Sequence, residues 1–309
     1  MKRTTTSFSP LGRLLMTGMV ILMTAAAGVA ADTAKRPAEA TIEAFGGEAK
    51  FEMQQLFKGG RLPNVAVATD GTVLATWGAT GGGGDWSKKG LEIRRSTDGG
   101  ATWSKSASIA NPGWQAGGLT VDEKSGEVLA FAEHWKWPKK PPPATIYRSG
   151  DHGKTWKIQK TVIEKDKNGN IPTMHMAEHG ITLLRGKCKG RLLRAARDYG
   201  DSDRPGNFPK HYNTAIYSDD CGKTWKTSDP FPAMGTGEGA VAELSNGLIY
   251  YNSRRHWDPK GLKLMRWEAW SDDGGATWTD LALSRVLPDG PLGERCNGCH
   301  AGLARLPVR

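Results

Sequence analysis

The 309-residue sequence is poor in cysteine, and after its first thirty residues it lacks any long apolar run. Four cysteines are far fewer than a disulfide-framed secreted domain carries, so the core has to come from side-chain packing. No later segment is long and apolar enough to span a bilayer. The formal net charge is +10, but the basic residues are scattered and form no cluster typical of a nucleic-acid-binding protein. We therefore expect no nucleic-acid partner and no membrane span beyond the N-terminus.

The first thirty residues follow the pattern of a secretory signal peptide. Lys2, Arg3 and Arg13 precede an apolar run over 14–30, and small residues occupy the cleavage position before Ala31. We expect residues 1–30 to be a signal peptide and residues 31–309 to form an exported domain, periplasmic or extracellular. An uncleaved N-terminal tether would give a similar pattern.

The composition is rich in two residues that suit β-structure. Forty glycines indicate many tight turns, and twelve tryptophans indicate heavy aromatic packing. With about 280 residues after the signal peptide, the chain can bury a large core. Composition therefore favours an all-β fold.

An eight-residue motif, Ser-x-Asp-x-Gly-x-Thr-Trp, occurs four times and organises the chain. The copies are 96–103, 149–156, 218–225 and 271–278, and each follows a short strand-like run. We call these motifs Asp boxes. Their aspartates lie in glycine-containing turns, where a short carboxylate can accept backbone N–H groups, and the tryptophan can fold beneath the turn. We interpret the boxes as structural.

A second hairpin precedes each Asp box. Its turns are centred on Asp70-Gly71, Ser125-Gly126, Lys189-Gly190 and Asn246-Gly247. Two consecutive hairpins make a four-stranded antiparallel unit, which is a propeller blade. Because both turns lie at one end of a blade, the four boxes should share one face, and the opposite face is left for function.

Two segments resemble the sialidase (neuraminidase) family, whose catalytic domain is a six-bladed propeller with such boxes. Gly60-Arg61-Leu62-Pro63 resembles the family's Arg-Ile-Pro motif, and residues 238–254 resemble the segment that carries a glutamate and a second arginine. The resemblance implies that Arg61 and Arg254 bind the substrate carboxylate and that Glu238 activates the nucleophile. It also implies that Asp85, in a glycine-rich loop, is the general acid/base.

The chemistry that the resemblance implies is release of terminal sialic acids with retained anomeric configuration. Guanidinium groups bind a carboxylate in a bidentate manner, and a tyrosine nucleophile needs a base such as glutamate because its ordinary pKa is about 10. The partner would be a sialylated glycan or another acidic sugar, and we expect neither a metal ion nor a cofactor. His179, Arg255, His256 and Trp257 are candidates for the pocket rim or for packing between blades. Glu243 is interpreted as a structural strand residue.

The sequence departs from the family pattern at its C-terminal end. Four boxes predict about four blades of the six-bladed type, so the propeller is expected to be incomplete there. The last tyrosine, Tyr251, lies upstream of the position where the family has its nucleophile, and the third arginine is not found. The alternative function is therefore a catalytically inactive propeller that binds a glycan or a protein. The sequence does not predict an oligomeric state.

Cys296-Asn-Gly-Cys299-His300 matches the pattern for c-type haem attachment. Only nine residues follow His300, and none of them is a methionine or histidine that could be a second iron ligand. We therefore favour a disulfide, an adventitious metal-binding dithiol or free cysteines over a haem.

Overall fold

The computed structural model describes residues 52–78, 90–115, 117–134, 139–174, 178–257, 265–289 and 302–304. The chain divides into two units, Met1–Glu39 and Ala40–Arg309, and every described residue belongs to the second. Asp85, the predicted signal peptide and the Cys296–His300 motif lie outside the described residues.

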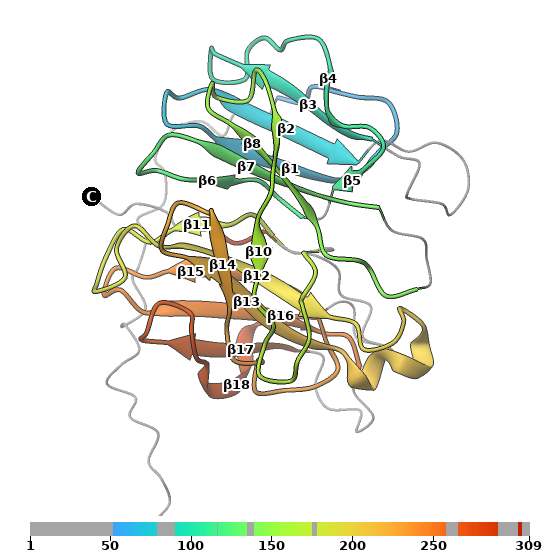
Figure 1. Ribbon diagram of the computed structural model, residues 1–309, viewed down its shortest axis with the longest axis vertical. Helices are drawn as coiled ribbons and strands as arrows, with labels where there is room; N and C mark the ends of the chain where they lie inside the picture. The colour runs from blue at the N-terminus through green and yellow to red at the C-terminus, as the bar shows by residue number, and fades with distance from the viewer. Residues whose placement is uncertain are drawn as a thin grey trace, which may run out of the picture. The chain divides into compact units, whose positions relative to one another are not determined.

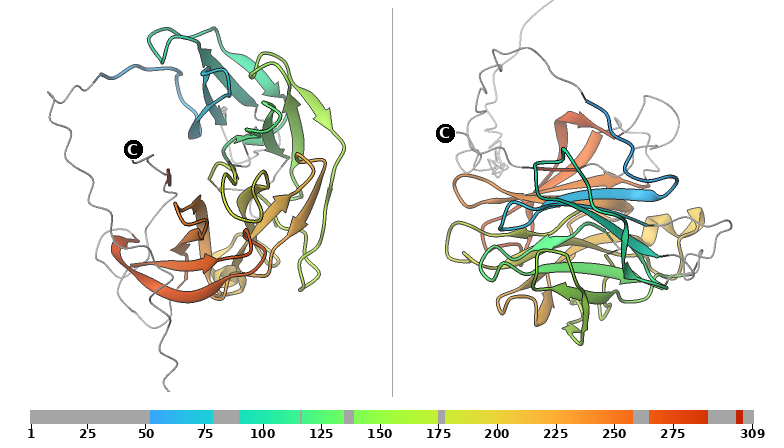
Figure 2. Two further views of the ribbon diagram at one scale, coloured as in Figure 1. Left: turned by 90° about the vertical axis from the view of Figure 1, so that its left-hand side faces the viewer. Right: turned by 90° about the horizontal axis from the view of Figure 1, so that it is seen from above.

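The described chain is all-β apart from one short 3-10 helix, Pro205–Lys210, and it forms four blades that follow one another (Figures 1 and 2). Blade 1 contains β1 (Arg61–Val67), β2 (Val73–Gly78), β3 (Leu91–Ser96) and β4 (Ala107–Ala110). Blade 2 contains β5 (Trp114–Gln115), β6 (Thr120–Val121), β7 (Val128–Glu133), β8 (Thr145–Ser149) and β9 (Lys157–Gln159). Blade 3 contains β10 (Val162–Ile163), β11 (Ile181–Thr182), β12 (Leu192–Asp198), β13 (Tyr212–Ser218) and β14 (Thr224–Thr227). Blade 4 contains β15 (Thr236–Glu243), β16 (Ile249–Arg255), β17 (Met265–Ser271) and β18 (Thr279–Pro288).

The predicted propeller architecture is confirmed. The four hairpin turns join β1 to β2, β6 to β7, β11 to β12 and β15 to β16, and all four pairs are antiparallel. One detail differs from the expected four-stranded unit, because β10 adds a parallel strand to the outer edge of blade 3. The backbone N–H of Glu164 donates to the carbonyl of Trp225 at 2.8 Å there, so the connection from blade 2 covers that edge.

The Asp boxes form nearly identical turns, as their repeated sequence predicts. In the third box, Asp220 accepts hydrogen bonds from the backbone N–H and the hydroxyl of Thr224, at 2.9 and 2.7 Å. The Ser218 hydroxyl donates to Asp220 and accepts the N–H of Gly222 at 2.8 Å. The other three boxes repeat these bonds. Each aspartate is therefore committed to its own turn.

The boxes also join neighbouring blades, a role that the motif alone did not predict. The glycine at the fifth position of a box lies against a leucine of the preceding blade: a Cβ added to Gly275 would lie 2.5 Å from Leu193, and one added to Gly222 would lie 2.8 Å from Leu129. A Cβ added to Gly153 would lie 3.0 Å from Leu74. These glycines have φ values of +76 to +85°, so both backbone conformation and packing exclude a side chain.

Arginines add a polar link at the same blade boundaries. Arg95 of blade 1 donates to the carbonyl of His152 in the second box at 2.8 Å, and Arg148 of blade 2 donates to that of Cys221 at 2.6 Å. Arg191 of blade 3 contacts the carbonyl of Gly274 at 3.2 Å. The second, third and fourth boxes thus fix the position of their blades against the preceding one.

The apolar core lies between blades. One buried cluster joins blades 1 and 2 and includes Leu74, Ile93 and Val128. A second joins blades 2 and 3, and a third joins blades 3 and 4 around Leu193, Tyr251 and Trp278. Face-to-face packing of sheets therefore forms the core, as expected for a chain with too few cysteines to be held together by disulfides.

Replacing Gly275 by alanine should destabilise the protein more than the same change at Gly100. Both residues have positive φ, and a Cβ there costs about 1–2 kcal/mol. Only Gly275 packs against a preceding blade, and overpacking adds about 1–3 kcal/mol. Urea unfolding of the two variants measures the difference, and equal losses would contradict the proposed docking role of the box glycine.

Replacing Asp220 by alanine should cost about 1 kcal/mol at pH 7, because its turn loses several hydrogen bonds. Burial opposes ionisation of Asp220, but the bonds from Thr224 and Ser218 outweigh it and lower the pKa to about 2. The carboxylate therefore stabilises the fold above about pH 4, and this contribution is lost as the pH falls towards 2. Thermal unfolding should show the variant and the wild type converging in that interval, and Lys223→Ala, in the same loop, serves as the control.

Candidate functional site

The strand registers place several charged residues at the blade end opposite the Asp boxes. Arg61 pairs with Gly78, at the far end of β1 and β2 from the Asp70-Gly71 turn. Thr236 pairs with Arg255 at the corresponding end of blade 4, so Glu238 and Arg254 lie there too. We call this the axial end, because the innermost strands β1, β6, β11 and β15 begin there.

Glu238 and Arg254 form an ion pair at the axial end of blade 4. Nη1 of Arg254 contacts Oε1 and Oε2 of Glu238 at 2.9 and 2.8 Å. Glu238 is buried and the side chain of Arg254 is 14% exposed. Burial alone would raise the pKa of Glu238, but the charges of Arg254 and Arg197 outweigh it, so the pKa is lowered and the carboxylate is ionised.

Arg197 is the second cation near Glu238, and it is buried. Its guanidinium donates to Nδ1 of His211 at 2.7 Å, to Nδ1 of His256 at 2.5 Å and to the hydroxyl of Tyr199 at 3.0 Å. A guanidinium can only donate, so both imidazoles accept at Nδ1 and carry their proton on Nε2. Burial and the charge of Arg197 lower the pKa of His211 to about 4 and also lower that of His256. Both rings are therefore neutral.

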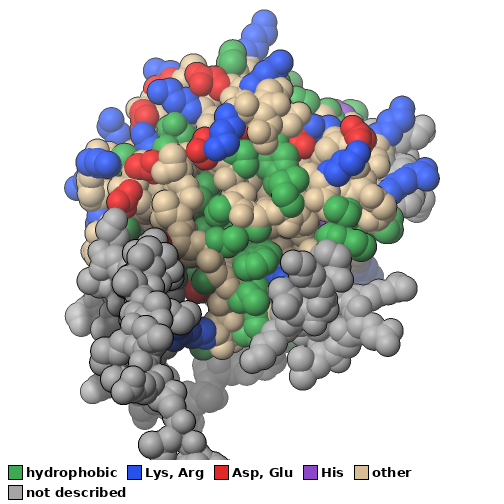
Figure 3. Space-filling model, turned by 90° about the horizontal axis from the view of Figure 1, so that it is seen from below, with side chains coloured by type: hydrophobic (Ala, Val, Ile, Leu, Met, Phe, Trp, Pro, Cys, Tyr) green, Lys and Arg blue, Asp and Glu red, His purple; other side chains and the backbone are tan. Residues whose placement is uncertain are grey.

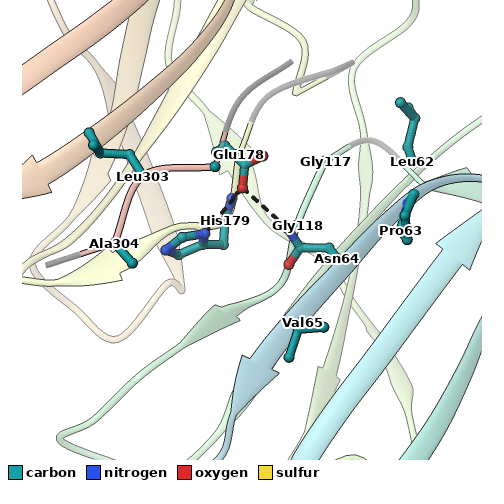
Figure 4. A pocket seen from close by; sticks show the side chains of 11 residues that line it. Leu62, Pro63, Asn64, Val65, Gly117, Gly118, Glu178, His179, Leu303 and Ala304 are labelled. Atoms are coloured by element: carbon teal, nitrogen blue, oxygen red, sulfur yellow. Dashed lines mark hydrogen bonds and ion pairs between the residues drawn. The ribbon is translucent and has the colours of Figure 1, made fainter. Parts of the chain in front are cut away.

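Two cavities open along the innermost strands. The first has a volume of about 630 Å³ and is lined by Leu62–Val65, Gly117, Gly118, Glu178, His179 and Gly302–Ala304 (Figure 4). The second, of about 560 Å³, extends along β1, β6, β11 and β15 and includes Glu123, Thr182 and Glu243. His179 lines both cavities.

The cavity wall depends on a contact between blades 1 and 3. The Asn64 amide donates to Oε2 of Glu178 at 3.3 Å, and the Glu178 N–H donates to the carbonyl of Gly239 in blade 4 at 3.2 Å. Asn64 reaches blade 3 by passing Gly118 of blade 2, where an added Cβ would lie 2.5 Å from its side chain. The glycine therefore permits the contact across blade 2.

The predicted site residues have different surroundings. Arg61 is exposed at the start of β1, next to Leu62 and Pro63 of the first cavity, while Glu238 and Arg254 contact each other and line neither cavity. Of the rim candidates, only His179 lines a cavity. Arg255 is buried with its guanidinium 5.3 Å from the centre of the Trp267 ring, and His256 stacks on Phe208. Trp257 is 42% exposed, and its backbone N–H donates to the carbonyl of Gly235.

Glu243 is structural, as predicted, because its carboxylate accepts the N–H groups of Leu184 and Arg185 at 2.8 and 2.9 Å. In the described part of the chain, no group of three or more histidine, cysteine, aspartate or glutamate side chains could hold a metal ion. The same part contains no helix long and apolar enough to cross a membrane.

Glu178 and Arg197 were not predicted from the sequence. A signal for Arg197 was present, because it lies seven residues after its hairpin glycine, as Arg254 does in blade 4 and Glu133 does in blade 2. Comparing this position across the repeats would have found it. Glu178 precedes a two-residue strand and matches no such register, so only the packing of blades 1, 3 and 4 reveals it.

Charged side chains are mixed on the face of the molecule seen in Figure 3. Basic and acidic groups alternate around a central region of apolar side chains, among the atoms that this view describes. Among the side chains that this view describes, basic groups lie beside acidic ones, in agreement with the scattered basic residues of the sequence.

Comparisons with known proteins agree with the propeller architecture. A family model described as a BNR repeat-like domain matches residues 71–289. A sialidase from Micromonospora viridifaciens is 27% identical over 79% of this chain and 40% of its own, and a xyloglucanase from Paenibacillus sp is 26% identical over 72% of this chain and 21% of its own. The structure of an intramolecular trans-sialidase from Ruminococcus gnavus, in complex with oseltamivir carboxylate, has a TM-score of 0.54 and 16% identity, covering 74% of this chain and 71% of that chain. The chain spans less than half the length of the Micromonospora sialidase and of the Paenibacillus xyloglucanase, which are both glycoside hydrolases.

Replacing Arg254 by methionine should destabilise the protein by about 3 kcal/mol at pH 7, because Glu238 keeps a buried charge without its nearest cation. The double variant Glu238→Gln/Arg254→Met should lose less, since it carries no such charge. In the single variant the pKa of Glu238 should rise, so the deficit should grow as the pH rises above its ordinary value of 4.5. Chemical denaturation at pH 4 and pH 7 checks this, and equal losses in the single and double variants would contradict the ion-pair account.

Proposed function

Because the chain belongs to the BNR repeat-like domain family and is distantly related to glycoside hydrolases, we propose that it is a sialidase-type domain that binds acidic sugars. The observation that carries this proposal is the buried Glu238–Arg254 pair, which lies at the same blade end as the exposed Arg61. Its substrate would be a glycoconjugate with a terminal sialic acid. The reaction would be exo-α-sialidase hydrolysis with retained configuration.

In this proposal the two arginines bind the sugar carboxylate. Arg61 is exposed and can approach a ligand directly, whereas Arg254 would share its guanidinium between Glu238 and the ligand. A guanidinium has five N–H donors, so it can serve two carboxylates at once. Asp85 would protonate the glycosidic oxygen, and Glu238, held ionised by Arg254 and Arg197, would be the base beside the nucleophile.

A second candidate function is binding without hydrolysis, and the tyrosines favour it. None of the six tyrosines lines either cavity. Tyr199 and Tyr251 are fully buried, with hydroxyl groups that contact Arg197 and the carbonyl of Thr214, and burial raises the pKa of both. A buried phenol with a raised pKa is a poor nucleophile. We therefore expect these 309 residues to bind the ligand and to hydrolyse it slowly or not at all.

The proposed location is outside the cytoplasm. This proposal rests on the basic, apolar and small-residue segments of residues 1–30. An exported domain would meet sialylated glycans in the periplasm or outside the cell.

Replacing Arg61 by alanine should weaken the binding of free sialic acid about ten- to hundredfold, because a charge-assisted hydrogen bond contributes about 1.5–3 kcal/mol. Isothermal titration of the wild type and the variant measures the change. Arg285→Ala, which removes an exposed arginine from β18, is the matched control and should bind as the wild type does. Binding that does not depend on Arg61 would contradict the proposed carboxylate site.

A fluorogenic sialoside separates the two candidate functions. Rapid turnover by the purified chain would show that it has a competent nucleophile and would contradict the binding-only candidate. Arginine-dependent binding with negligible turnover would support that candidate.

A further inference from the structure

His179 lies where the two axial cavities meet. Four residues line both cavities, namely Val65, His179, Leu303 and Ala304, and only His179 among them has a polar side chain. The imidazole is partly exposed, at 27% of its side-chain surface. It is therefore accessible from both cavities.

Glu178 fixes the orientation of this imidazole. Oε2 of Glu178 contacts Nδ1 of His179 at 3.2 Å and accepts the backbone N–H of His179 and the amide of Asn64, each at 3.3 Å (Figure 4). Because a carboxylate only accepts, Nδ1 of His179 carries the proton. In the neutral ring the lone pair is then on Nε2, on the side away from Glu178.

Other polar side chains of the second cavity are committed to the fold. Glu243 accepts two backbone N–H groups, as described above. The Thr182 hydroxyl donates to the carbonyl of Val121 at 2.8 Å and accepts the N–H of Glu123 at 3.1 Å. Among the described residues, none donates a hydrogen bond to Nε2 of His179, so in the neutral ring this atom is an acceptor that a ligand can reach.

The charge and shape of the cavities select the ligand. Their linings include the carboxylates of Glu123, Glu178 and Glu243 and no lysine or arginine, so an anionic group would find no guanidinium or ammonium group to bind it there. Arg185, which is outside the linings, contacts Glu243 at 3.8 Å. Leu62, Pro63 and Val65 form an apolar wall that can cover the C–H face of a ring. A neutral molecule with hydroxyl donors and an apolar face fits both conditions. The first cavity is within the range of about 300–1,000 Å³ that small-molecule sites occupy.

We propose that the junction of the two cavities, at His179, is a binding site for a neutral sugar unit. A sugar hydroxyl would donate a hydrogen bond to Nε2 of His179. Glu178 is a positioning residue, because it acts by holding the tautomer and the ring orientation. Neither Arg61 nor Arg254 lines the two cavities, so this site uses other side chains than the carboxylate site proposed for them. It would let the propeller recognise an uncharged sugar of a glycan as well as an acidic one.

The test uses the full chain with ¹⁵N-labelled histidine and a panel of neutral methyl glycosides of galactose, glucose, xylose and mannose. The variant His179→Phe identifies the Nε2 resonance of His179, because that resonance disappears from its spectrum. At least one glycoside of the panel should shift this resonance. The same glycoside should leave the Nε2 resonance of the exposed His134 unchanged. His179→Phe should weaken binding of that glycoside about tenfold, the loss expected from one hydrogen bond. His134→Phe is the matched control and should bind as the wild type does.

Arg61→Ala distinguishes this site from the proposed function. It should bind the neutral glycoside like the wild type, whereas its binding of sialic acid should fall. If neutral binding depends on His179 but sialic acid binding does not depend on Arg61, the carboxylate proposal fails and the neutral-sugar site stands. If no glycoside of the panel shifts the His179 resonance, or if folded His179→Phe binds like the wild type, the neutral-sugar site is overturned. If His179→Phe does not fold, Glu178→Gln gives the second measurement. The neutral-sugar site is also overturned if this variant binds the glycoside with the wild-type affinity and shows the wild-type shift of the His179 Nε2 resonance.

Discussion

The fifth residue of each Asp box after the first is a glycine pressed against a leucine of the preceding blade, and the arrangement of the blades depends on this contact. The hydrogen bonds within a box fix the shape of its turn, and the glycine lets that turn approach Leu74, Leu129 or Leu193 closely. An arginine of the preceding blade then donates to a box carbonyl. Each of these three boxes therefore sets both the conformation of its own hairpin and the position of its blade against the one before it.

Fixing the blades at the box end has a consequence at the opposite end. The starts of the innermost strands come close enough for Asn64 of blade 1 to contact Glu178 of blade 3, and for Glu178 to contact Gly239 of blade 4. Charged groups that would be costly to bury singly are buried there in pairs and networks, such as Glu238 with Arg254 and Arg197 with two neutral histidines. The box end supplies structural stability, whereas the axial end carries the groups suited to binding.

Two kinds of surroundings occur along the innermost strands, and they differ in charge. Arg61 and the Glu238–Arg254 pair provide guanidinium donors, which suit an anionic ligand. The cavities around His179 are lined by carboxylates and apolar side chains and by no lysine or arginine, which suits a neutral one. An acidic sugar attached to neutral sugars presents both kinds of group, so the two proposed sites are compatible with one extended glycan.

The sequence alone determined the number of described blades, the hairpin turns and the end of the propeller at which Arg61, Glu238 and Arg254 lie. These features follow from a repeated motif and from the alternation of strand direction, which depend on residues close together in the chain. Only the tertiary structure decided that Glu238 and Arg254 bind each other, that Arg255 is buried and His256 stacks on Phe208, and that Glu178 orients His179. These contacts join strands or blades, and their distances depend on how glycines such as Gly118 and Gly275 let neighbouring blades approach. The sequence pattern therefore specifies each blade, and packing between blades specifies the site.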